Sequence, residues 1–463
     1  MLHKYYTHTV VLLCVWLFSA RVLAEDKLTH RKEVSLVSEK TEKEPRNFGE
    51  KNLRELTSEL LEYNPELKGL VEKIQVYELR VPQAGSLDDL RFSFEGSNIP
   101  IRNPALNRTA MTGLQIYLRQ KFPFPGKLKL KKQIASTQAE QEKQAYYERL
   151  NQLVARFKQT YFEYVYVNQA IRLNQRTKAK FKGLVKFLEA RYSIGKGTQQ
   201  DILKTKIEIS NIEKTLIQLR EAQKVLVSRL NTLLYRPENI PLKIKLEHQG
   251  LTSLSISIEA LRQLAQENRP WIKKKTAQIQ EAELGHRLAK KGLLPDFDFG
   301  AGYRIRQVSP GDPVNGEDFF SAGVTINLPV YAGKKQNKQI QEMLHRQKQE
   351  EYLKQATTQE VFYQAEKAYF DSLQFKSQFY LLKDNIIPQD NATINSSRAS
   401  YEADKIDFLN VLLSEISLLN HQIDQVRYHS QYHQKLAEIE MAVGLPIHII
   451  NQAATIQEGS DAK

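Results

Sequence analysis

Cysteine is almost absent from this chain: among 463 residues the only one is Cys14. It lies inside the apolar stretch Val10–Ala20, which follows the basic residue Lys4 and precedes Val22-Leu23-Ala24, a small-residue pattern typical of a cleavage site. We therefore expect residues 1–24 to be a signal peptide. The mature chain would then contain no cysteine, which excludes disulfides, a thiol nucleophile and a thiolate metal site.

Long apolar runs are missing as well. After the signal peptide no segment offers the ~18 consecutive apolar residues of a membrane-spanning helix, so none is predicted. The net charge is +14, but lysine and arginine alternate with glutamate and glutamine along predicted helices, which does not indicate nucleic-acid binding. No arrangement typical of catalysis is found, so we predict no enzyme. His429 and His433 are spaced i,i+4 without a following glutamate, and we predict no metal or cofactor site.

What the chain does contain is a long internal duplication. The segment Phe124-Pro125-Gly126-Lys127 returns about 207 residues later as Tyr331-Ala332-Gly333-Lys334, and Asn64-Pro65 has a counterpart in Arg269-Pro270. A period of this length is far above that of solenoid repeats. Two structural repeats are therefore predicted, 53–245 and 254–450. A flexible N-terminal segment, 25–52, and a flexible tail, 451–463, flank them because both are polar and charged.

Each repeat begins with an amphipathic helical stretch, about 53–80 and 256–291, and then changes its period. Apolar and polar residues alternate strictly from Asp296 and again from Phe320, which is the pattern of a strand with one apolar face. The first repeat shows the same alternation more weakly. The strands are predicted at about 89–96, 110–120, 295–306 and 318–328, which makes four strands per chain.

A very long helical stretch follows each hairpin, at about 127–190 and 334–399. Its apolar residues have coiled-coil spacing, and a helix of this length would extend ~95 Å. Both stretches end at a tyrosine-containing turn, 192–199 and 401–407, and return as shorter helices. Four strands cannot close a barrel, and open sheet edges are not tolerated in hydrocarbon. The chain is therefore expected to associate, and two copies would supply eight strands and three copies twelve.

At this point the chain resembles the TolC family of outer-membrane efflux channels over residues 53–450. The motifs Asn64-Pro65-Glu66-Leu67, Gln83-Ala84-Gly85 and Pro123-Phe124-Pro125-Gly126-Lys127-Leu128 are similar to its heavy-metal-efflux branch. The resemblance implies a mainly α chain with a transmembrane β-barrel: a homotrimer whose twelve-stranded barrel continues as a periplasmic coiled-coil tunnel. It also implies the outer membrane of a Gram-negative bacterium as location, with outer-membrane lipid around the barrel.

The resemblance further implies a passive exit duct for heavy-metal cations, which an inner-membrane pump of the RND type delivers through a periplasmic adaptor. The two turns would form the periplasmic tip that contacts this adaptor. The matching residues are Ile194, Gly195, Lys196, Ala403, Asp404 and Lys405, and the second turn lacks the glycine of the family pattern. Candidates for the constriction at the tip are Asp201, Tyr401, Asp407, Asn410 and Leu413, where Asn410 replaces an aspartate of the family's acidic ring.

Two other interpretations stay open from the residues. The duct could export drugs or type I secreted proteins, because the pump, not the duct, mostly selects the substrate. The chain could instead be a periplasmic coiled-coil or adaptor protein without a channel, although an adaptor would not carry strands in both repeats. The sequence does not identify the pump, the cargo or the signal that opens the tip.

Overall fold

The computed structural model describes residues 50–237, 240–242, 244 and 250–453. The predicted signal peptide and most of the predicted flexible segments lie outside the described residues. Lys51 and Asn52, which we expected in the flexible N-terminal segment, make defined contacts, since Lys51 bridges to Ile244 and Asn52 caps the first described helix. Residues 451–453 are helical, and Asn451 donates a hydrogen bond to the carbonyl oxygen of Ser253 at 2.8 Å.

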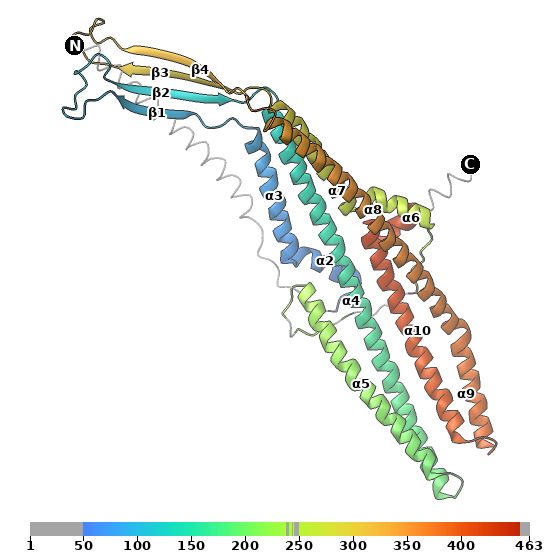
Figure 1. Ribbon diagram of the computed structural model, residues 1–463. Helices are drawn as coiled ribbons and strands as arrows, with labels where there is room; N and C mark the ends of the chain where they lie inside the picture. Colours follow the sequence, from blue (N-terminus) through green and yellow to red (C-terminus); the bar gives the residue numbers. More distant parts are fainter. Residues whose placement is uncertain (1–49, 238–239, 243, 245–249, 454–463) are drawn as a thin grey trace. The chain divides into compact units, whose positions relative to one another are not determined.

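The predicted duplication is visible in the order of the elements (Figure 1). The first repeat contains α2 (Leu53–Tyr63), α3 (Pro65–Gly85), β1 (Arg91–Ser97), β2 (Gly113–Phe122), α4 (Lys127–Ser193) and α5 (Gln199–Leu233). The second contains α6 (Ile258–Asn268), α7 (Pro270–Lys291), β3 (Phe297–Ile305), β4 (Phe319–Ile326), α8 (Gln336–Leu381), a π-helical segment η1 (Leu382–Ile386), α9 (Ile387–Glu402) and α10 (Phe408–Val443). The mainly helical fold with four strands is confirmed.

The four strands form one antiparallel sheet in the order β1-β2-β3-β4, so the two hairpins join through β2 and β3. The strand ends differ from the predicted ones by two or three residues at most positions. Strand β2 begins at Gly113 instead of 110 because a turn precedes it. In this turn the Thr109 and Thr112 hydroxyl oxygens are 2.8 Å apart, and the Thr112 hydroxyl also donates a hydrogen bond to the Asn98 carbonyl oxygen. One face of the sheet is almost entirely apolar, and the other carries the charged residues of the strands.

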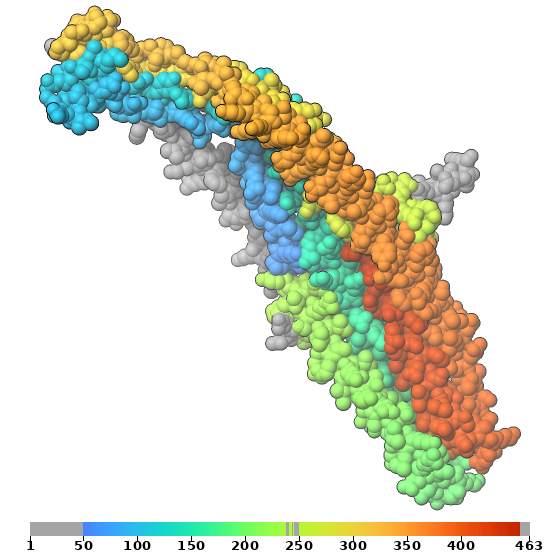
Figure 2. Space-filling view, viewed as in Figure 1, coloured from blue at the N-terminus to red at the C-terminus, as the bar shows by residue number. Residues whose placement is uncertain are grey.

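The helices are arranged side by side around α4, which packs against α3, α5, α7 and α10, while α8 packs against α7 and α10 (Figures 1 and 2). In the first repeat α3 begins where α5 ends, since the Asn64 amide donates a hydrogen bond to the Leu233 carbonyl oxygen at 3.4 Å. In the second repeat α7 begins beside the end of α10. Gly444, the residue after α10, lies so close to Asn268, the last residue of α6, that a Cβ added to it would be 3.0 Å from the Asn268 carbonyl oxygen. No helix of the described part is long and apolar enough to span a bilayer.

The second long helix differs from the first. Helix α4 runs for 67 residues without interruption, whereas the predicted helix over 334–399 is divided by the π-helical segment η1. Pro388 follows this segment in the first turn of α9. Proline has no backbone N–H and its ring clashes with the carbonyl four residues earlier, so a locally widened turn relieves both problems.

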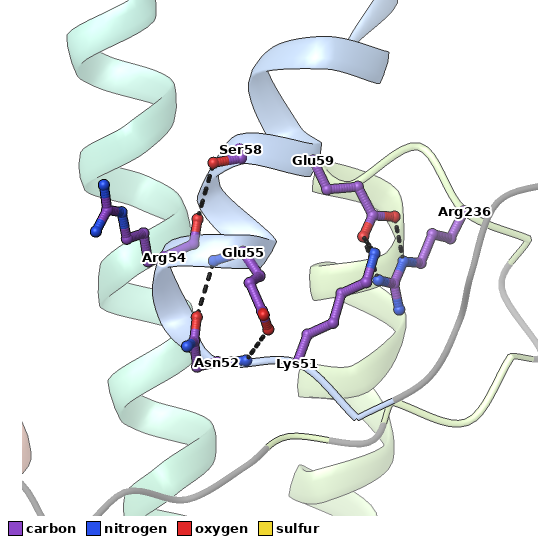
Figure 3. Close-up of polar contacts among 7 residues, drawn as sticks. All are labelled: Lys51, Asn52, Arg54, Glu55, Ser58, Glu59 and Arg236. Atoms are coloured by element: carbon purple, nitrogen blue, oxygen red, sulfur yellow. Dashed lines mark hydrogen bonds and ion pairs between the residues drawn. The ribbon is translucent and has the colours of Figure 1, made fainter. Parts of the chain in front are cut away.

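The joint between α2 and α5 is stabilised by a buried ion pair (Figure 3). The Arg236 guanidinium donates hydrogen bonds to both carboxylate oxygens of Glu59, at 2.7 and 2.5 Å, and Lys51 reaches the same carboxylate at 2.8 Å. Both side chains of the Glu59–Arg236 pair are at most 5% exposed. Burial alone would raise the pKa of Glu59, but the hydrogen bonds from Arg236 and Lys51 outweigh it and lower the pKa.

Candidate functional site: the paired tip turns

The candidate site is formed by two helix-turn-helix connections that the structure brings together. The first tip turn, residues 194–198, joins α4 to α5, and the second tip turn, residues 403–407, joins α9 to α10. These are the turns that the sequence predicts as the adaptor-contacting tip.

Both turns have the same hydrogen-bonding pattern at the helix end. The Lys196 and Lys405 N–H groups donate to the carbonyls of Arg191 and Ser400, at 2.9 and 2.8 Å. The residue before each lysine takes a left-handed conformation, with φ of 76° at Gly195 and 54° at Asp404. This is the Schellman motif, in which glycine is usual at the left-handed position and a short polar residue is tolerated. Asp404 therefore occupies the position of the missing second glycine without altering the turn.

Arg191, in the last turn of α4, connects the two tip turns, and the sequence analysis did not single it out. Its guanidinium forms an ion pair with Asp404 of the second turn and donates a hydrogen bond from Nε to the Lys196 carbonyl oxygen at 3.2 Å. The same guanidinium lies 4.6 Å from the centre of the Tyr401 ring, within the range of a cation–π contact. One side chain thus contacts both turns and the aromatic residue beneath them.

Tyr401 belongs to the apolar layer that supports the turns. It is 8% exposed, and its ring is 5.4 Å from Phe408 and 6.5 Å from Phe187, both in edge-on geometry. Burial raises the pKa of the Tyr401 hydroxyl, Arg191 opposes this rise, and the charge of Asp201 adds to it. The hydroxyl makes no hydrogen bond within the described part of the chain. Tyr401 therefore packs the interior of the tip and is also held beneath a cation.

The other predicted constriction residues lie near the start of the returning helices. Asp407 is the residue before α10, but its side chain does not cap the helix. Asn410 and Leu413 are exposed in the first turns of α10. Asp201 is half-buried at the equivalent place in α5, and its backbone N–H donates a hydrogen bond to the Thr198 hydroxyl at 3.2 Å. Among these residues, Tyr401 lies beside Arg191, and Asp201 and Asp404 are near enough to Tyr401 for their charges to act on its hydroxyl.

A second set of charges lies deeper between the helices. Glu415 of α10 is 2% exposed and pairs with Lys180 of α4 and with Arg398 of α9, the latter at 2.5 Å. The equivalent positions of the first repeat carry Glu189 and Lys206, which form an exposed ion pair at 3.0 Å with the signs reversed. Glu415 therefore ties α10 to both of its neighbours. The sign-reversed pair 209 residues earlier is the sequence signal from which this contact could have been found.

His429 and His433 of α10 pack among aromatic side chains of α4 and α8. The His433 ring stacks on Phe162 with 4.6 Å between ring centres, and it is 4.7 Å from the ring of His429. Burial, and to a smaller degree His429, lowers the pKa of His433 to about 3, so it is neutral in the fold. No group of three or more potential metal-ligating side chains occurs among the residues that the structure describes.

Comparison with known proteins places the chain in a family. The sequence model of the outer membrane efflux protein family matches residues 56–234 and 261–445, which correspond to the two repeats. The chain belongs to this family. It is accordingly an outer-membrane efflux channel of a tripartite system, trimeric and without enzymatic activity, with a large periplasmic helical part. No curated protein matches the sequence.

Solved structures agree with the fold. The outer membrane protein VceC from Vibrio cholerae has a TM-score of 0.71 at 19% identity, covering 85% of this chain and 96% of that chain. CusC also has a TM-score of 0.71, at 16% identity, with 88% and 96% covered. The open state of MtrE from Neisseria gonorrhoeae has a TM-score of 0.69 at 16% identity, with 86% and 89% covered. At these identities the likeness shows the fold, and CusC is no more similar than VceC.

Proposed function

We propose that this channel is a passive exit duct that is held closed at its periplasmic end by the contacts between the two tip turns. The observation that carries the proposal is the position of Arg191, which bonds to the first turn, pairs with Asp404 of the second and covers the Tyr401 ring. Separation of the turns would break the ion pair with Asp404 and the contact with the Tyr401 ring together, while the bond to Lys196 stays within the first turn. Opening would then require α9 and α10 to move relative to α4, which the Glu415–Lys180 pair also resists.

The tip turns are also the proposed docking surface for the periplasmic adaptor. Ile194 is 69% exposed at the start of the first turn, and Lys196 and Lys405 are exposed in the first and second turns. Ala403 is exposed at the position equivalent to Ile194. An adaptor would therefore meet one apolar and two basic side chains. Photo-cross-linking from position 194 to the cognate adaptor tests this docking, with position 218 on the side of α5 as control.

The closed tip is tested by the variant Asp404→Asn. Asparagine tolerates the left-handed backbone as aspartate does, so the turn is kept while the ion pair to Arg191 is lost. A pair as exposed as this one contributes about 0.2–1 kcal/mol. Three pairs would break together in a trimer, for about 0.6–3 kcal/mol, which raises the open population roughly 3- to 150-fold. The expected result is increased entry of vancomycin into a Gram-negative host that produces the variant.

The matched control is Glu402→Gln, which removes one exposed acidic charge next to the same turn without touching Arg191. It should leave vancomycin entry at the wild-type level. Arg191→Gln should raise entry at least as much as Asp404→Asn, because it removes the contact with Tyr401 as well as the ion pair. Adding Asp404→Asn to Arg191→Gln should change little more, because the ion pair is already lost. Equal entry in the wild type, Asp404→Asn and Arg191→Gln channels, at equal surface abundance, would show that Arg191 does not hold the tip closed.

For the cargo we propose heavy-metal cations, delivered by an RND-type pump, on the support of the short motifs around Asn64-Pro65 and Phe124-Pro125. The test is growth of a strain lacking this channel across a series of metal salts and of drugs. Sensitivity to metals alone, restored by the wild-type channel, is the expected outcome. Sensitivity to drugs alone would replace the metal assignment with a drug-exporting system and leave the duct itself in place.

A further inference from the structure

The duplicated aromatic-x-Gly-Lys motif lies at a place that the efflux function does not explain. Phe124-Pro125-Gly126-Lys127 connects β2 to α4, and Tyr331-Ala332-Gly333-Lys334 connects β4 to α8. Both are junctions where a membrane-spanning strand gives way to a periplasmic helix. A third junction, Gly292–Asp296, connects α7 to β3. The motif therefore marks the periplasmic border of the membrane in both repeats.

The three junctions are strongly basic. Residues 122–134, 287–296 and 328–341 contain ten lysines and arginines against one acidic residue, Asp296. That residue is already engaged, since it accepts hydrogen bonds from Lys127 at 2.7 Å and from the Phe124 N–H at 2.9 Å. The exposed lysines of these segments form no ion pair with any described residue. We call them the basic collar: Lys129, Lys131, Lys132, Lys290, Lys334, Lys335 and Lys338.

Exposed apolar residues lie directly beside the collar. Leu328, Val330 and Tyr331 are 72%, 77% and 75% exposed between β4 and α8, and Leu294 is 38% exposed before β3. Leu328 continues the apolar alternation of Phe320, Ala322, Val324 and Ile326 in β4, and that face must face lipid in a membrane-spanning strand. A band of leucine and valine, then a tyrosine, then lysines is the order of side chains found where a protein leaves the hydrocarbon and enters the headgroups.

The acidic residues of this region are on the other side of the sheet. Asp88 and Asp89, at the fourth junction, line a cavity together with Arg91 and Arg119 of the polar strand face. By contrast, the ammonium group of Lys291 lies 5.4 Å from the ring of Phe124 and donates a hydrogen bond to the Pro125 carbonyl oxygen at 3.1 Å. The acidic side chains Asp88, Asp89 and Asp296 thus share their cavity with basic side chains of the polar strand face, and none of the collar lysines lines it.

We propose that the basic collar binds the headgroups of anionic phospholipids in the leaflet that faces the periplasm. The apolar side chains would hold the junctions at the membrane border, and the lysines would reach the phosphate and glycerol groups beneath it. Each lysine near an anionic surface contributes about a fivefold gain in affinity. The collar would thereby fix the depth of the channel in the bilayer and keep the long periplasmic helices from tilting.

The experiment uses the full trimer, reconstituted either in phosphatidylethanolamine vesicles or in vesicles that also contain phosphatidylglycerol. After extraction, native mass spectrometry counts the lipids retained per trimer. The test variant is Lys290→Gln, Lys334→Gln and Lys335→Gln combined. The matched control removes three exposed lysines from the periplasmic helices, with Lys182→Gln, Lys186→Gln and Lys214→Gln combined.

The wild type and the control should retain phosphatidylglycerol in preference to phosphatidylethanolamine, and the test variant should lose this preference by about tenfold or more. Equal loss in the control would overturn the proposal, because it would reflect net charge alone. Unchanged retention in the test variant would also overturn it. Single-channel conductance of the same preparations separates this outcome from a failure of the proposed exit duct, since the collar lies far along the chain from the tip turns.

Discussion

Replacing Glu59, the buried glutamate at the α2–α5 joint, tests whether the first repeat needs an ion pair where the second repeat has leucines. In the first repeat the joint contains the Glu59–Arg236 ion pair, with side chains 5% and 1% exposed. The equivalent positions of the second repeat are Leu264 and Leu445, which pack against the apolar core of that repeat. The duplicated fold therefore accepts an ion pair or a pair of leucines at the same place.

The expected loss of stability follows from the burial of the Glu59 and Arg236 side chains. Glu59→Leu leaves the Arg236 guanidinium buried without a carboxylate, and Arg236→Leu leaves the carboxylate with Lys51 alone. Each single change is expected to cost about 3–5 kcal/mol per chain, since it leaves an incompletely paired buried charge. The double change to leucine should be nearly neutral, because the desolvation of both charges disappears with them. The coupling between the two sites would then be at least as large as either single effect.

The assay is thermal unfolding of the detergent-solubilised trimer, followed by circular dichroism and by loss of the trimer band on gels. Each single variant should unfold roughly 3–6 °C below the wild type, and the double variant within about 1 °C of it. A double variant as unstable as the single ones would refute the reasoning, because it would mean that the joint needs the charges themselves.

Acidification gives an independent check on the same pair. The pKa of Glu59 is lowered in the fold from its ordinary value of 4.5. The carboxylate therefore contributes stability above pH 4.5 that is lost as the pH falls through the folded pKa. The double leucine variant should lack this component of acid sensitivity, while a distant control such as Glu221→Gln should keep it.

Three further outcomes are expected. Gly195→Ala places a side chain at a φ of 76° with open space around it, so it should cost about 1–2 kcal/mol through backbone strain alone, measurable as a lower unfolding temperature. His433, with a pKa of about 3 in the fold, stays neutral at pH 4, whereas the same side chain in the unfolded chain takes up a proton below pH 6.5. The free energy of unfolding should therefore fall by about 3 kcal/mol per chain between pH 7 and pH 4. His433→Gln should reduce this fall. Gly300→Ala would bring a Cβ within 2.2 Å of the Tyr117 hydroxyl oxygen, so the yield of folded trimer should drop and Tyr117→Ser should restore it.

The sequence was sufficient for those parts of the fold that depend on local periodicity. The alternation from Asp296 and Phe320 predicted the strands, and the apolar spacing after Lys127 predicted a long helix. The interruption of the second long helix was missed, although Pro388 was its visible signal. Proline at a helix start is usually harmless, and only its place inside a longer helical run required the π-helical segment.

Contacts between distant parts of the chain could not be predicted in this way. Arg191 and Asp404 are 213 residues apart, and nothing in either neighbourhood indicates that they meet. The pairs of Glu415 were missed as well, although the opposite charges of Lys206 and Glu189, 209 residues earlier, were a visible signal. Asp404 illustrates a different limit: the sequence showed a missing glycine, but only the backbone showed that aspartate takes over its left-handed conformation.

The most direct test of the central claim is single-channel recording of the purified trimer in planar bilayers, with the Asp404→Asn variant measured in parallel. The account predicts discrete conductance steps from the wild type, and a longer or more frequent open state when the contact between the tip turns is removed. Open states of the same frequency and duration in both proteins, when both are shown to be inserted as trimers, would contradict a channel that these turns close.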